Sequence, residues 1–144
     1  MGSFKKPIVE LGKPGMMGMS EVEYNINVNV ETAYLPEQSD PESDRYVFSY
    51  TITIENTGEI ASRLMSRHWI ITDADGKVQE VEGEGVVGEQ PYLRPGEGFR
   101  YTSGTILETP VGSMHGTYLM VTDDSVEFEA EIPPFTLSIP HTLH

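Results

Sequence analysis

The chain has 144 residues, 38% hydrophobic and 22% charged, a balance that suits one globular domain with a real core. A formal net charge of -14 at pH 7 makes nucleic acid and anionic membranes unsuitable partners, because both are negatively charged. The chain has no cysteine, which excludes disulfides and thiolate metal sites and fits a reducing compartment. No apolar run approaches the roughly 20 residues that span a bilayer.

Residues 1–17 differ in character from the acidic chain that follows, because they hold three lysines and two prolines. We predict that they are a leader or a remnant of cloning and that they are disordered. Residues 18–139 are then expected to form a single domain, and residues 140–144 a frayed tail.

Two long strands are predicted first in the domain. From Val22 to Val30, and again from Tyr46 to Ile54, every second side chain is apolar, so residues 21–34 and 46–56 have the alternation of half-buried antiparallel strands. The polar segment between them holds two prolines and is predicted to be a loop.

The third predicted strand covers residues 61–72, and its alternation slips. Trp69 shares a face with Arg67, whereas Leu64 lies on the other face. A β-bulge between Leu64 and Arg67 would place Leu64 and Trp69 on the same side. We expect Trp69 to be the buried centre of the core. Its expected neighbours include Ile26, Phe48 and Leu119.

The remaining elements are also strands joined by turns, and no amphipathic helix is evident. The predicted fold class is therefore all-β: an immunoglobulin/fibronectin type III-like antiparallel β-sandwich of about seven strands. The later strands are predicted at residues 77–81, 99–107, 117–122 and 126–132, with an extension over 135–139, and loops or turns at 73–76 and 108–113.

A glycine-rich stretch after residue 82 has the spacing GxGxxG at Gly83, Gly85 and Gly88. A dinucleotide site would need a helix directly after the glycines, but Pro91 and Pro95 interrupt any helical run. We therefore interpret the stretch as a glycine-punctuated connection between strands. The alternative is an anion site made by backbone N–H groups, which needs no helix.

Several linked motifs resemble the ApaG family, also called CorD. The resemblance covers residues 22–137 and leaves out both ends of the chain. The motifs are ENTG at 55–58, RHWIITD at 67–73, GEGVVGEQP at 83–91, LRPGE at 93–97, YTSG at 101–104, TPVG at 109–112, MHGTYLM at 114–120 and IPPFTL at 132–137.

The resemblance implies a fibronectin-type sandwich and a cytoplasmic bacterial protein. Members are often encoded beside a diadenosine tetraphosphate hydrolase, and the second family name reflects a link to cobalt and magnesium handling. Related domains are fused to eukaryotic F-box and polymerase-interacting proteins, which implies a protein-interaction module. Such fold-level analogy does not assign chemistry.

No catalytic or metal-binding pattern emerges from the residues themselves. Asp73 and Asp75 suggest a calcium loop, but Val78 stands where glycine is required and Lys77 occupies a ligand position, so a hairpin turn is favoured. The histidines lack HExxH spacing, and Ser103 lies in no GxSxG motif. We predict a protein that is not an enzyme, has no catalytic or metal-ligating residues and needs no cofactor.

Two functions follow as hypotheses. The first is a non-catalytic module that binds a protein partner through a loop surface or an edge strand. The alternative is a protein that binds a small phosphate, a nucleotide or a divalent cation, linked to diadenosine tetraphosphate metabolism or cobalt and magnesium handling. Nucleic acid and membranes are not expected partners. The candidate anion site comprises Gly83, Gly85, Gly88, Arg67, Arg94 and Arg100.

Overall fold

The computed structural model describes residues 2–3, 8–10 and 21–140. Within these residues the regular structure is β-strand apart from two short 3-10 turns, and no described helix is long and apolar enough to cross a membrane. The strands are β1 (Gly2–Ser3), β2 (Ile8–Glu10), β3 (Glu21–Glu23), β4 (Ile26–Tyr34), β5 (Tyr46–Asn56), β6 (Ser62–Asp73), β7 (Val78–Glu84), β8 (Tyr92–Leu93), β9 (Gly98–Leu107), β10 (Val111–Thr122) and β11 (Glu127–Ser138); the 3-10 turns are Pro36–Gln38 and Pro41–Ser43.

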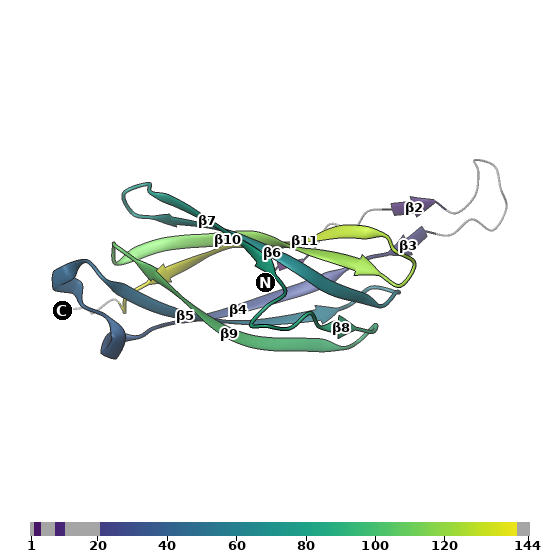
Figure 1. Cartoon of the computed structure of the whole chain (residues 1–144), viewed down its shortest axis with the longest axis horizontal. Helices are drawn as coiled ribbons and strands as arrows, with labels where there is room; N and C mark the ends of the chain where they lie inside the picture. Colours follow the sequence, from purple (N-terminus) through teal and green to yellow (C-terminus); the bar gives the residue numbers. More distant parts are fainter. Residues whose placement is uncertain (1, 4–7, 11–20, 141–144) are drawn as a thin grey trace.

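Two antiparallel sheets face each other in a sandwich-like arrangement (Figure 1). One sheet has the strand order β1-β4-β5-β9, and the other has the order β11-β10-β6-β7 with β8 paired to β6. Strands β2 and β3 form a separate two-stranded antiparallel sheet. The all-β prediction is confirmed, and the outer strands β7 and β9 end their respective sheets.

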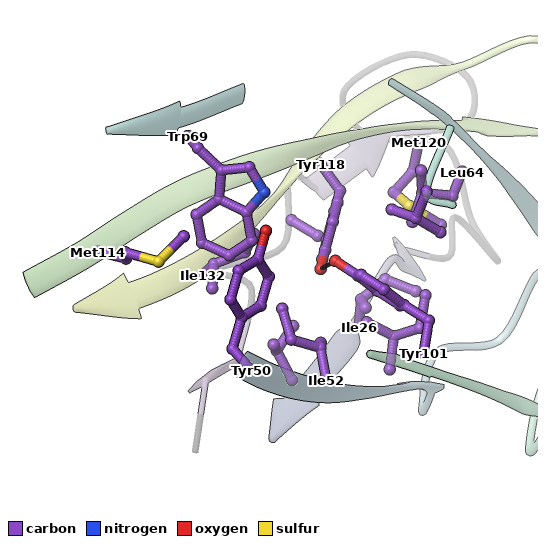
Figure 2. Packing of buried hydrophobic residues seen from close by; sticks show 14 of the residues in the cluster. Ile26, Tyr50, Ile52, Leu64, Trp69, Tyr101, Met114, Tyr118, Met120 and Ile132 are labelled. Atoms are coloured by element: carbon purple, nitrogen blue, oxygen red, sulfur yellow. Dashed lines mark hydrogen bonds between the residues drawn. The ribbon is translucent and has the colours of Figure 1, made fainter. Parts of the chain in front are cut away.

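Trp69 lies inside the sandwich, as predicted (Figure 2). Its side chain is 2% exposed and makes edge-on contacts with Tyr50 and Phe135, with ring centroids 5.3 and 5.9 Å away. Ile26 and Phe48 are buried as expected, but the expectation for Leu119 was wrong. Strand β10 directs Met114, Tyr118 and Met120 into the core, so Leu119, one residue out of phase, lies half-buried on the outer face.

The predicted β-bulge is confirmed. In the pairing of β6 with β10, Leu119 lies opposite Ser66 and Met120 lies opposite Leu64, so Met65 is an extra residue in β6. The shift lets Leu64 and Trp69 share the inner face. Arg67 follows the bulge, two residues before Trp69, and therefore lies on that inner face as well.

Several boundaries differ from the prediction. The strand expected over 21–34 is divided into β3 and β4, because β3 pairs with β2 whereas β4 belongs to the first sheet. Strand β10 begins at Val111 rather than at residue 117. The loop expected over 108–113 therefore ends at residue 110. Strand β8 was missed, since two residues carry no periodicity. Most of the predicted leader and tail lie outside the described residues.

The turn after β6 has the predicted hairpin form. One carboxylate oxygen of Asp73 accepts hydrogen bonds from the backbone N–H groups of Asp75 (2.9 Å) and Lys77 (3.0 Å). Gly76 has a φ of 83°, which suits glycine at this position. The Asp73 carboxylate therefore closes a turn, as the hairpin interpretation expects.

Candidate functional site

Arg67 and Gly83 face each other across the pairing of β6 with β7. The Arg67 guanidinium donates from Nη1 to the carbonyl oxygens of Glu84 (3.1 Å) and Gly85 (2.9 Å). A Cβ at position 83 would lie 2.7 Å from Nη1 and 2.9 Å from Nη2. A side chain at position 83 would therefore displace the Arg67 guanidinium, whose two hydrogen bonds secure the start of the glycine-rich stretch.

The stretch continues as a tight turn across residues 86–89. The backbone N–H groups of Val86 and Glu89 each donate to the other residue's carbonyl oxygen, at 2.8 and 2.9 Å. The two central residues, Val87 and Gly88, both have positive φ, 44° and 83°, as in a type I′ hairpin turn. This structure agrees with the interpretation as a connection between strands. It also commits the N–H groups of Gly85, Val86 and Glu89 to backbone carbonyls.

The other two predicted arginines do not contact this turn in the described part of the chain. Arg94 lies beside the Tyr92 ring and forms an ion pair with Glu97 (3.5 Å). Arg100 lies on β9, in the opposite sheet, and forms an ion pair with Glu31 (3.6 Å). Of the candidate anion residues, the structure thus brings together Arg67 with the three glycines, and places Arg94 and Arg100 elsewhere.

Two buried tyrosines join the sheets near Arg67. The hydroxyls of Tyr101 on β9 and Tyr118 on β10 form a 2.5 Å hydrogen bond (Figure 2). Burial is the main cause that raises the pKa of both phenols, and the nearby Arg67 charge partly opposes it. Both hydroxyls stay protonated at neutral pH, so the pair acts as a neutral polar link within the core.

This pair makes stability sensitive to alkaline pH. The phenol pKa values are higher in the folded protein than in the unfolded chain. The stabilisation that the two protonated phenols give the folded protein is therefore complete below the unfolded pKa of about 10 and is lost as the pH rises above it. We expect the free energy of unfolding, measured with urea, to begin to fall at about pH 10 and to keep falling as the pH rises toward the folded pKa values. The double variant Tyr101→Phe, Tyr118→Phe should show a shallower fall, and an unchanged pH profile would contradict this assignment.

Among the described residues, no group of three or more histidine, aspartate or glutamate side chains could hold a metal ion. His68 forms a pair with Glu80, with 2.8 Å between Nε2 and Oε2. His141 and His144 lie outside the described residues.

The outer edge of β7 is a different kind of candidate site. No described strand pairs with this edge, and six of the seven β7 residues are exposed, the exception being the half-buried Gly83. The pairing of β7 with β6 is hydrogen-bonded at both ends: Asp73 N donates to Lys77 O (3.0 Å), and Gly85 N donates to Met65 O (2.8 Å). Antiparallel hydrogen bonds alternate along a strand, so the intervening even-numbered residues direct their N–H and C=O groups away from β6. These residues are Val78, Glu80, Glu82 and Glu84, of which Glu84 contributes only its N–H because its carbonyl oxygen accepts from the Arg67 side chain of β6.

A groove of about 630 Å³ lies between β7 and β9, the outer strands of the two sheets. Its apolar lining includes Val81 from β7 and Ile106 from β9, which are 40% and 46% exposed. Ile71 lies at its base and is almost fully buried. Because the sandwich is open here, inward-facing positions on β7 remain accessible next to the unpaired backbone. The edge and the groove together define the β7 edge site.

An all-β sandwich with an accessible edge strand is the class of protein that this geometry defines. Residues 36–122 match the family described as the ApaG domain. The chain is 66% identical to Protein ApaG of Thiobacillus denitrificans over 121 residues, which cover 84% of this chain and 95% of that protein. It is 61% identical to Protein ApaG of Nitrosomonas europaea over 125 residues, covering 87% of this chain and 98% of the relative.

Solved structures agree with this match. The crystal structure of an ApaA protein from Bordetella pertussis is 53% identical, with a TM-score of 0.80, over 83% of this chain and 97% of that one. The chain belongs to the ApaG family.

Of the residues predicted from the sequence for a site, only Gly83 lies in β7, and it was predicted as part of an anion site rather than of a strand edge. The signal was present: Glu80, Glu82 and Glu84 alternate with Val81 and Gly83. Alternation alone does not show which strand ends a sheet, since that depends on pairing between distant segments.

Proposed function

We propose that this protein is a non-catalytic binding module that adds an extended segment of a partner protein to strand β7. The observation that carries the proposal is the edge of β7, with which no described strand pairs, beside a groove that is lined in part by apolar side chains. Strand addition uses the main chain for affinity and pockets for alternate side chains for specificity. The β7 edge site offers both components.

The backbone of β7 supports this mode in detail. No described strand pairs with the outward donors and acceptors of Val78, Glu80 and Glu82, which are the template that a partner strand needs. Glu84 adds its N–H alone, because its carbonyl oxygen accepts from Arg67. Inward residues of an added strand would continue the inner face of the sheet past Val81 and enter the groove. We also propose that the sandwich is of the immunoglobulin/fibronectin type III kind and that the protein is cytoplasmic.

The alternative, binding of a small phosphate, nucleotide or divalent cation, has less support. Arg67 already donates to two carbonyl oxygens, and three N–H groups of the glycine turn are paired. Glu84 and Glu89 add negative charge close to the position that an anion would occupy. We therefore place the binding function at the β7 edge rather than at the glycines.

A proline at position 82 tests the proposal. Because the Glu82 N–H points away from β6, proline removes a donor to the partner and leaves the pairing with β6 intact. Glu82→Pro should abolish strand addition and shift the melting temperature little. Glu82→Ala is the matched control, since it removes the same carboxylate and keeps the N–H.

The measurement is quantitative capture of proteins from the lysate of a bacterium whose own ApaG protein is deleted. The three baits are wild type, Glu82→Pro and Glu82→Ala. Partners retained by wild type and Glu82→Ala but lost from folded Glu82→Pro are the expected result. Equal capture by the proline and alanine variants would show that the edge of β7 is not the binding site.

A further inference from the structure

We infer that the segment added to β7 alternates basic and aliphatic side chains, with its basic residues opposite Glu80, Glu82 and Glu84. This inference rests on the proposed function and specifies the chemistry of the partner. It follows from the two faces that β7 would present to a neighbouring strand.

The outer face of β7 is acidic over its whole centre. Glu80, Glu82 and Glu84 stand at alternate positions opposite Ile70, His68 and Ser66 of β6. All three glutamates are exposed, and only Glu80 has an ion-pair partner among the described residues, His68. Side chains directly opposite in neighbouring strands lie about 4.5–5.5 Å apart at Cβ, so opposite charges there stabilise pairing and like charges oppose it.

The inner face of β7 favours aliphatic side chains in the added strand. Residues of the added strand between the basic positions would lie beside Gln79, Val81 and Gly83. Those beside Gln79 and Val81 would point into the groove, whereas the one beside Gly83 would lie next to the Arg67 guanidinium. The apolar side chains of Val81, Ile71 and Ile106 line that groove, together with Val47 and Leu35. Its rim also carries polar residues, among them Gln38, Gln79 and Arg45, whose positive charge disfavours a further basic side chain inside the groove. Aliphatic side chains there would bury the exposed apolar surface of Val81 and Ile106, which favours binding.

The same charges argue against a second copy of this chain as the occupant. When β7 pairs antiparallel with another β7 with the inner faces aligned, glutamates oppose each other in the registers of greatest overlap. Glu80 opposes Glu82 if Val81 lies opposite Val81, and Glu80 opposes Glu84 if Glu82 lies opposite Glu82. Like charges directly opposite each other destabilise a strand pair, and a net charge of -14 on each copy adds to the repulsion. A basic segment reverses both effects.

Three capped, fluorescently labelled peptides of seven residues, the length of β7, test the inference. The first alternates lysine and valine and begins and ends with lysine. The second has the same composition, with its lysines and valines grouped in two blocks. The third replaces every lysine of the first with glutamate. Binding is measured by fluorescence anisotropy at low salt, where surface charge contributes most.

The alternating lysine peptide should bind wild type at least about tenfold more tightly than either of the others, a ratio that corresponds to about 1.4 kcal/mol. The double variant Glu82→Gln, Glu84→Gln, which keeps the pair of His68 with Glu80, should weaken this binding about tenfold. Glu82→Pro should abolish it.

The outcomes separate this inference from the proposed function. Binding that is lost in Glu82→Pro but is equal for all three peptides would overturn the charge pattern and leave strand addition supported. Binding of the lysine peptide that persists in Glu82→Pro would overturn strand addition on β7. Absence of binding by the alternating lysine peptide, with selective capture in the lysate experiment retained, would overturn the inference alone.

Discussion

Replacing Trp69 with alanine is expected to lower the free energy of unfolding by about 3–5 kcal/mol, a large part of the stability of a single domain. The indole is 2% exposed and lies between Tyr50 from the facing sheet and Phe135 from β11. Alanine would leave a cavity at the point where the two sheets meet, and close-packed surroundings relax only in part.

Urea unfolding followed by circular dichroism measures the change. His68→Ala is the matched control: it is the next residue in β6, but its side chain faces outward and pairs with Glu80, so a loss of about 1 kcal/mol or less is expected. Similar losses for the two variants would contradict the central position of Trp69 in the core.

Gly85→Ala is expected to have the second large effect, about 2–4 kcal/mol of lost stability. Gly85 has a φ of 62°, which costs other residues about 1–2 kcal/mol, and a Cβ there would overlap the Glu89 carbonyl oxygen. Gly88→Ala is the matched control within the same motif, because Gly88 also has positive φ but no atom lies within 4 Å of the added Cβ. It should cost only the conformational term, about 1–2 kcal/mol.

Thermal melting of both variants, followed by a pyrophosphate titration of each folded protein, separates the two interpretations of the glycine motif. If the glycines serve backbone geometry, stability falls in the order wild type, Gly88→Ala, Gly85→Ala, and pyrophosphate gives no saturable signal. A folded Gly88→Ala protein that loses a clear wild-type titration signal would favour the anion site instead.

The strands could be predicted because apolar and polar side chains alternate with a period of two in antiparallel strands that have one solvent-exposed face. Residues 46–56 were predicted with the bounds of β5, and the slipped parity around Leu64 and Trp69 led directly to the bulge. Errors arose where local pattern gives no information. Leu119 is as apolar as its inward neighbours, and only the register of β10 against β6 shows which face it occupies.

The candidate site was harder to predict because it depends on contacts between distant segments. The sequence suggested that Arg67 could join the glycines in an anion site. The structure does place Arg67 beside the glycines, but its guanidinium packs against Gly83 and donates to the Gly85 carbonyl oxygen. Arg94 and Arg100 shared the same charge but lie on other elements, where glutamates pair with them. The unpaired edge of β7 follows from strand order, which no local pattern encodes.

Hydrogen exchange of the outward backbone amides of β7 tests the central claim most directly. The amides of Val78, Glu80, Glu82 and Glu84 are compared in the free protein and in the protein saturated with the alternating lysine peptide or with a partner identified by capture. Strand addition predicts slower exchange at these amides on binding, with little change on β9. Unchanged exchange along β7 in a saturated complex would contradict the proposed function.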